Sequence, residues 1–123
     1  MPRFPNVEDV LCEMLADLAP TVTRRSPKID PPFIFIRRAG GNNDGITDRP
    51  VVRVEVLAGT RDESEDIAAD VRDRILESGC TSVGGVLIDT ASEITGTQQI
   101  PDLNTDERKV PATYRLSFRQ SRH

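Results

Sequence analysis

Histidine and aromatic residues are scarce in this sequence. Its 123 residues include one histidine, His123, and no tryptophan, and aromatic residues make up only 4%. Catalysis by Ser-His-Asp or Cys-His groups needs a histidine held in place as the base, and many zinc sites need histidine ligands. A lone terminal histidine supplies neither, so both kinds of site are excluded. The hydrophobic core must also be mostly aliphatic.

Cysteines and long apolar runs are rare as well. Cys12 and Cys80 are the only cysteines, and they form no CxxC motif. One disulfide between them stays open, although idle thiols in a reducing cytosol are the preferred interpretation. The opening MPRFPNVEDV lacks the apolar segment of a signal peptide. No apolar run reaches the roughly 20 residues that a membrane span needs, so no membrane association is expected.

Basic residues are not in excess. Lys and Arg number 16 against 20 Asp and Glu, which gives a net charge of −4. Nucleic-acid-binding domains are usually basic, so a general DNA or RNA binder is disfavoured. The length fits one domain over residues 1–123, which would bury roughly 65–70% of its unfolded surface. Because hydrophobic residues make up only 37%, we expect subunit contacts to supply part of the stability.

Two amphipathic helices are predicted. The first is capped by Asn6 and stopped by Pro20. The second begins with a capping box of Thr60 and Glu63, runs to Leu76 and ends near Gly79. Its charged outer face reads as a solvated surface. In the first helix, apolar residues recur every three or four positions, at Val7, Val10, Leu11, Met14, Leu15 and Leu18.

Strands are expected on both sides of the second helix. The clearest are 51–58 and 112–119, in which apolar and polar residues alternate. The run 33–36 is apolar on both faces, which suits a strand covered on one side by helices and on the other by a neighbouring subunit. Shorter strands are predicted over 21–25, 83–90 and 94–100. Segments 26–32 and 101–109 read as connectors.

Residues 40–50, GGNNDGITDRP, form a loop by composition. They lack the GxxxxGK[ST] pattern of a phosphate-binding loop, and a strand follows instead of a helix. Asp44 and Asp48 do not have the spacing of an EF-hand, and no glutamate closes the loop. The preferred interpretation is a flexible hairpin tip that contacts another protein.

A cationic face is predicted on the sheet. If the strands pair, Arg53, Arg115 and Arg119 share one polar face with Glu55. This face is either a solubilising surface, a subunit interface or the wall of a DNA-containing lumen. A metal-dependent nuclease is disfavoured, because Asp48 and Glu55 bracket the best strand but no lysine follows at the expected place.

The residues therefore predict an α+β fold, with a mainly antiparallel sheet and two amphipathic helices packed on one face. The prediction is a single domain, with a flexible loop at 40–50 and a frayed C-terminal tail. No catalytic residue, cofactor or metal site is expected.

The order of segments also resembles a known family. PPFIFIRRAGG, then DRPVVRVEVLAGTRDESEDIA and the terminal PDLNTDERKVPATYRLSFR are similar to the tail terminator, or tail completion, proteins of long-tailed bacteriophages such as lambda. The resemblance covers about 7–119. Its most specific parts are the step from strand to Gly-Gly at 36–41 and the strand-turn-helix over 50–74.

The resemblance implies a structural virion protein in the phage tail or neck, assembled in the host cytoplasm. It implies a homohexameric ring that caps the tail tube protein, stops its polymerisation and meets a head-completion or connector protein. Genomic DNA would pass through the lumen without sequence-specific binding. The alternatives are another neck protein or a small non-catalytic adaptor domain. The residues proposed for contacts are Arg37, Arg38, Gly40, Gly41, Asn42, Asn43, Asp44, Asp48, Arg49, Arg53, Arg115 and Arg119.

Overall fold

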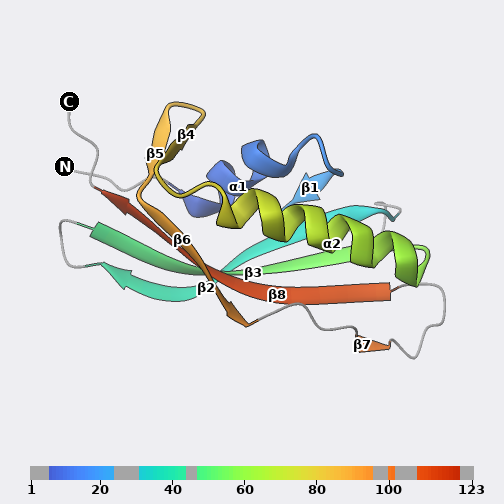
Figure 1. Ribbon diagram of the computed structural model, residues 1–123. Coiled ribbons are helices and arrows are strands. Elements are labelled where there is room, and N and C mark those ends of the chain that lie inside the picture. Colours follow the sequence, from blue (N-terminus) through green and yellow to red (C-terminus); the bar gives the residue numbers. More distant parts are fainter. Residues whose placement is uncertain (1–5, 24–30, 44–46, 96–99, 102–107, 120–123) are drawn as a thin grey trace.

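The computed structural model describes residues 6–23, 31–43, 47–95, 100–101 and 108–119. Both helices lie over the same face of a mainly antiparallel sheet, which confirms the predicted α+β fold (Figure 1). The elements are, in chain order, α1 (Val7–Leu15), β1 (Thr21–Val22), β2 (Phe33–Asn43), β3 (Thr47–Ala58), α2 (Arg61–Leu76), β4 (Thr81–Val83), β5 (Val86–Ile88), β6 (Thr90–Thr95), β7 (Ile100–Pro101) and β8 (Arg108–Arg119).

Helix α1 starts at its predicted cap. The Oδ1 atom of Asn6 accepts hydrogen bonds from the backbone N–H groups of Glu8 at 2.9 Å and Asp9 at 3.4 Å. These are donors that have no partner inside the helix. The helix ends at Leu15, before the predicted stop at Pro20. A turn follows it, in which the Leu18 N–H bonds the Leu15 carbonyl at 3.0 Å.

Helix α2 also starts as predicted, because the Thr60 hydroxyl accepts a hydrogen bond from the Glu63 N–H at 3.2 Å. Its end differs from the prediction. The helix was expected to end near Gly79, a residue type that favours positive φ, but the positive φ after α2 falls at Cys80, with φ 63°. The Cys80 N–H bonds the carbonyl of Ile88 at 2.8 Å, so the contact with β5 fixes the turn at that residue.

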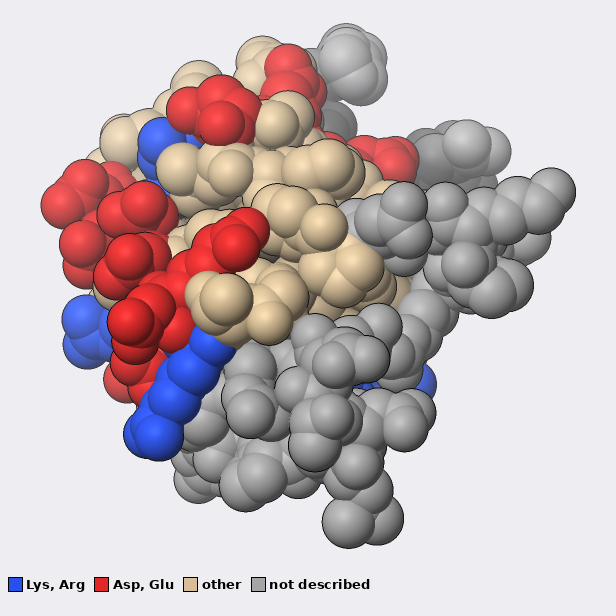
Figure 2. Space-filling view, turned by 90° about the vertical axis from the view of Figure 1, so that its right-hand side faces the viewer, with Lys and Arg blue, Asp and Glu red and all other residues tan. Residues whose placement is uncertain are grey.

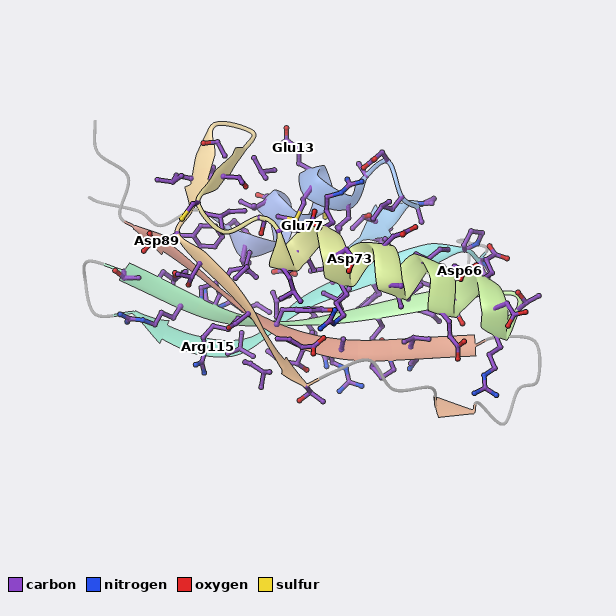
Figure 3. The ribbon with its side chains drawn as sticks, in the orientation of Figure 1. Glu13, Asp66, Asp73, Glu77, Asp89 and Arg115 are labelled. Atoms are coloured by element: carbon purple, nitrogen blue, oxygen red, sulfur yellow. The ribbon has the colours of Figure 1, made fainter. Side chains whose placement is uncertain are left out.

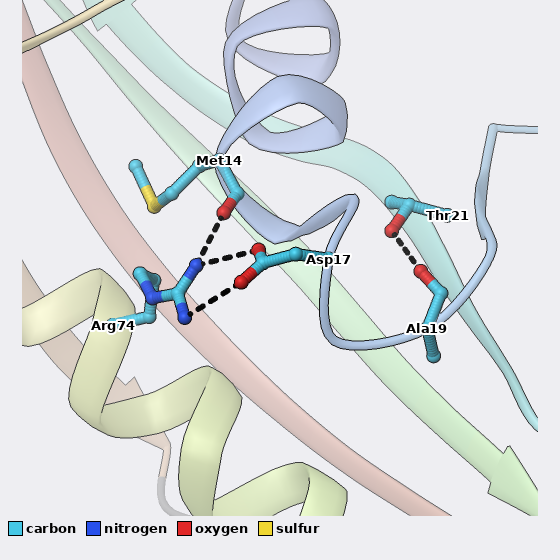
Figure 4. Close-up of polar contacts among 5 residues, drawn as sticks. All are labelled: Met14, Asp17, Ala19, Thr21 and Arg74. Atoms are coloured by element: carbon cyan, nitrogen blue, oxygen red, sulfur yellow. Dashed lines mark hydrogen bonds and ion pairs between the residues drawn. The ribbon is translucent and has the colours of Figure 1, made fainter.

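One arginine joins the two helices (Figure 4). Arg74 of α2 donates to both carboxylate oxygens of Asp17, at 2.7 and 3.2 Å, and to the Met14 carbonyl at 3.0 Å. That carbonyl lies in the last turn of α1, where backbone acceptors lack helical partners. The hydrogen bond from Arg74 lowers the pKa of the Asp17 carboxyl.

The strands of the main sheet are ordered β1-β2-β3-β8-β6, and β7 also pairs with β8. Only β1 and β2 run parallel; the other pairs are antiparallel. The chain therefore places its last long strand in the middle of the sheet, between β3 and β6. This long-range pairing brings the two clearest predicted strands side by side.

The core lies between the sheet and the helices. Alternate residues of β2, β3 and β8 point into it, among them Ile36, Val54 and Leu116, which are fully or almost fully buried. Tyr114 is also buried, and its hydroxyl finds no hydrogen-bond partner in the described part of the chain. Burial raises the pKa of Tyr114 to about 12. From the helices, the buried residues are Val7, Val10, Leu11, Met14, Leu15, Ser64, Ala68, Val71 and Ile75.

The predicted cover for 33–36 needs a partial correction. Ile34 and Ile36 enter the helix-covered core, as expected of one face. Phe33, on the opposite face, is only 2% exposed within the single chain, so it does not need a neighbouring subunit to bury it. Phe35 is half-buried.

The predicted loop over 40–50 is wrong for most of its length. Strands β2 and β3 stay paired as far as Asn43 and Asp48, and only 44–46 lie outside the described residues. Glycine does not open a loop here because it forms a β-bulge: the register shifts between Arg38 and Gly40. Gly41 has φ 99°, and a Cβ added to it would collide with the Arg49 carbonyl of β3.

The predicted strand over 83–90 is confirmed only in part, as β5 over Val86–Ile88, because the chain reverses at the two glycines before it. Gly84 and Gly85 have φ values of 58° and 80°. Positive φ at both central residues is what a two-residue hairpin turn requires, so the glycines reverse the chain between β4 and β5. The weaker strand over 94–100 corresponds in part to β6 and β7, and 96–99 lie outside the described residues.

Candidate assembly surface

The sheet has one face that neither α1 nor α2 covers. On β3, the residues between the core positions Val52, Val54 and Val56 point to this side, and the antiparallel register aligns the matching residues of β2 and β8. We call this surface the open face. Its exposed or half-buried residues are Phe35, Arg37, Val51, Arg53, Glu55, Lys109, Thr113 and Arg115, and the buried Phe33, Leu57 and Pro111 lie on the same side.

Cations outnumber carboxylates on the open face. Glu55 is bound by Arg53 at 3.0 Å and lies 3.9 Å from the Lys109 ammonium. Arg37 and Arg115 are exposed, and neither forms an ion pair or side-chain hydrogen bond with any described residue. Figure 3 shows Arg115 on the side of the sheet away from the helices. The open face therefore has an excess of positive charge.

The strand register opposes two of these cations directly. Arg37 of β2 is the cross-strand partner of Arg53 of β3. Like charges at opposed positions destabilise a strand pair. Glu55 neutralises only the charge of Arg53, because the Nε atom of Arg53 donates a hydrogen bond to the Glu55 carboxylate.

The opposite side of the molecule is acidic. Figure 2 shows carboxylates gathered over the side where α2 lies, with few basic residues among them. All three arginines of α2 are held by carboxylates: Arg61 by Glu65, Arg72 by Glu93 and Arg74 by Asp17. The exposed carboxylates on α2 and at its C-cap that form no ion pair with a described residue are Asp62, Glu63, Asp66, Asp70, Asp73 and Glu77.

Two residues proposed for contacts, Arg38 and Asp48, bind each other. The guanidinium of Arg38 donates hydrogen bonds to both carboxylate oxygens of Asp48, at 3.1 and 3.3 Å. Its Nε atom also donates to the Gly40 carbonyl at 3.0 Å. The Asp48 side chain is 2% exposed and that of Arg38 38%. We call this pair the bulge clamp, because it ties the bulge of β2 to β3. Asp48 is thus an internal residue rather than part of an exposed loop.

The remaining predicted contact residues are spread along the same hairpin and its neighbour. Gly40 and Gly41 form the bulge, while Asn42 and Asn43 continue the backbone ladder opposite Arg49 and Asp48. Asp44 lies outside the described residues. Arg49 is exposed, and the backbone of Arg119 pairs with Thr47. The prediction that Arg53 and Arg115 share one face with Glu55 is confirmed. For the carboxylates of α2, the sequence pattern predicts only a solvated surface.

Few groups with chemical reactivity come together in this fold. Within the described residues, no three His, Cys, Asp or Glu side chains form a group that could hold a metal ion. Cys12 and Cys80 are free thiols, and burial, with Asp9 and Glu8 nearby, raises the pKa of the Cys12 thiol. No helix that the structure describes is long and apolar enough to cross a membrane.

The fold is an α+β domain whose helix layer is acidic and whose open sheet face is basic, with the features of a structural protein. The family model described as "Phage tail termination protein" matches residues 3–123. The chain therefore belongs to the phage tail termination protein family, and it is a structural tail protein of the virion. Proteins of this family are not typically catalytic.

A solved structure has the same fold. A chain in the "Virion of native gene transfer agent (GTA) particle" matches with a TM-score of 0.61 and 10% sequence identity. The match covers 91% of this chain and 85% of that chain. At this identity the likeness shows the fold alone. No curated protein sequence matches this chain significantly.

Proposed function

We propose that this protein forms a ring, a homohexamer, that caps the finished tail tube and stops its polymerisation. Membership of the tail termination family carries the proposal. The similar fold in a gene transfer agent virion supports assembly into a particle. The opposite charges of the helix layer and the open face suit a subunit that contacts further copies of itself. The protein would act in the phage tail or neck after assembly in the host cytoplasm.

The partners follow from this position. One end of the ring would contact the tail tube protein, and the other would offer a surface to a head-completion or connector protein. Genomic DNA would pass through the lumen without sequence-specific binding. The net charge of −4 suits this role, because an acidic subunit does not hold a polyanion tightly.

Tail tubes assembled without a terminator provide the test. Adding the purified protein should fix tube length and place one ring at a tube end, seen by negative-stain microscopy, with the number of copies given by native mass spectrometry. A protein that binds purified heads but leaves tube length unchanged would be a different neck protein. A stable monomer that binds neither tubes nor heads would contradict the proposed function.

A further inference from the structure

The open face carries more cations than carboxylates, so part of its positive charge is not neutralised. Arg37 and Arg115 have no ionic partner among the described residues, and Arg37 also faces the like charge of Arg53 across the strands. An anionic surface from outside the chain would relieve both features. The anions that a ring of tail proteins can meet are the carboxylates of another copy or of a partner protein and the phosphates of DNA.

Helix α2 presents carboxylates in an arrangement that fits the cations of the open face. They recur at intervals of three and four residues, which places them in one stripe along the helix. The stripe points away from the buried residues Ala68, Val71 and Ile75. Figure 3 shows Asp66, Asp73 and Glu77 along this helix, above the sheet. The carboxylate stripe consists of Asp62, Asp66, Asp70, Asp73 and Glu77, all exposed.

The stripe is costly within one chain. Carboxylates three or four residues apart repel each other on a helix. Arg74 attracts Asp70 and Glu77, and Arg72 attracts Asp73, but the ion pairs of these arginines are made with Asp17 and Glu93. An external cationic partner would turn this repulsion into attraction. DNA binding at the open face would leave the stripe unexplained, whereas contact with a second copy accounts for both surfaces at once.

The spacings of the two surfaces also agree. Arg37 and Arg115 lie two strands apart and two residues out of register, because Arg53 pairs with both Arg37 and Thr113. Strand spacing and rise place their Cα atoms roughly 12 Å apart. Asp66 and Asp73 are separated by about 10 Å along the helix, from its rise per residue. Long arginine side chains can span the difference.

We propose that the carboxylate stripe of one copy docks on the open face of the next copy. This inference rests on the proposed function, since it names the contact between neighbouring subunits of the ring. The contact is heterologous: two different surfaces meet, and repeating it closes a ring when the rotation between copies allows. Pairing two open faces, or two stripes, would instead bring like charges together.

Charge reversal on each surface provides the test. One variant carries Arg37→Glu and Arg115→Glu, a second carries Asp66→Lys and Asp73→Lys, and a third carries all four changes. Assembly is measured as protein bound to purified tail tubes and as self-association in sedimentation velocity at low salt. Each two-site variant should assemble about tenfold or more weakly than wild type, and the four-site variant should recover, because its surfaces are again complementary.

Controls separate this contact from general charge effects. Asp9→Lys with Glu13→Lys on α1 changes the net charge as much as the stripe variant, and it should assemble like wild type. Circular dichroism and thermal unfolding of every variant establish that it folds. Wild-type assembly by the two-site variants, or a folded four-site variant that fails to recover, would overturn the contact.

The remaining outcomes are also decisive. If wild type caps tubes and the reversed variants do so equally well, only this contact fails and the proposed function stands. If wild type neither assembles nor binds tubes, both fail. If the open-face variant alone loses assembly and also loses retention of duplex DNA in a low-salt filter assay, the open face meets DNA and the contact is overturned.

Discussion

The two halves of the β2–β3 hairpin are held together in different ways. In the half under the helices, residues such as Ile34 and Ile36 of β2 pair with Val56 and Val54 of β3 and are fully or almost fully buried. Beyond the bulge, the hairpin extends past the end of α2 (Figure 1). There the strands are held by the close approach at Gly41 and by the bulge clamp.

One pair of strands can therefore contain two regions that open with different free energies. Apolar burial in the first half couples the strands to the whole core, so its loss should unfold the domain. In the second half, β3 stays paired with β8, and β2 is held by its backbone ladder to β3, the close approach at Gly41 and one ion pair, so loss of those last two contacts should open the tip alone. Hydrogen exchange of backbone amides can separate the two cases, and the following variants test them from the largest expected effect to the smallest.

Ile36→Ala should have the largest effect. The side chain is 0% exposed in the helix-covered core. Truncation leaves a cavity there, and we expect the free energy of unfolding to fall by about 3–4 kcal/mol. Denaturant titration measures the loss, and exchange should accelerate throughout β2, β3 and β8. The half-buried Val51→Ala on the open face is the matched control and should lose about 1 kcal/mol. Equal losses would contradict the comparison.

Gly41→Ala should open the far half of the hairpin. With φ 99°, an alanine is strained, and its Cβ would meet the Arg49 carbonyl of β3. We expect a local cost of about 2–3 kcal/mol, seen as faster exchange at Asn42 and Asn43 with little change in the core. Gly59→Ala is the control, because a Cβ added there meets nothing within 4 Å. Uniform destabilisation of the domain would argue against two separate units.

Arg38→Met should release the bulge clamp. The change leaves the Asp48 carboxylate buried without its cation, at a cost of about 2 kcal/mol, reduced by the partial exposure of Arg38. Adding Asp48→Asn should recover part of the loss, because the buried charge is then removed. The neighbouring Arg37→Met should change the free energy of unfolding by less than about 0.5 kcal/mol. An equal effect from both arginine variants would exclude a structural clamp.

Tyr114→Phe should have the smallest effect and the opposite sign. The tyrosine hydroxyl is buried beneath the helices without a hydrogen-bond partner in the described residues, so its removal relieves a desolvation cost. We expect a free energy of unfolding that is unchanged or higher by about 1 kcal/mol. A clear loss of stability would reveal a partner for this hydroxyl. Exchange at the hairpin tip should stay as in wild type.

Part of the fold was predictable because its signals are local. The caps at Asn6 and Thr60 bond their own helices, and the alternation over 51–58 reports burial on one face of a strand. The loop over 40–50 was predicted wrongly for a physical reason. Glycine and asparagine signal positive φ equally well in a loop and in a bulge, and only cross-strand pairing separates the two.

The candidate site was predictable to a similar extent. Arg53 and Arg115 were expected on one face, and they lie there. The clamp between Arg38 and Asp48 was not expected, because it depends on the register across the bulge. The stripe on α2 had a visible signal in its spacing of three and four residues. The complementary charge of the stripe and the open face can be recognised only when the positions of the helix layer and the sheet are both known.

The sequence by itself determined where the helices begin, which of their sides are apolar and which strands alternate. These properties arise from neighbours in the chain, through caps, periodicity and charge. Only the tertiary structure decided that β8 lies between β3 and β6, that Asp48 is internal, and that acidic and basic surfaces occupy different layers. Those features arise from contacts between residues far apart in the chain. The sequence pattern alone does not say which of these residues pair, or in which register.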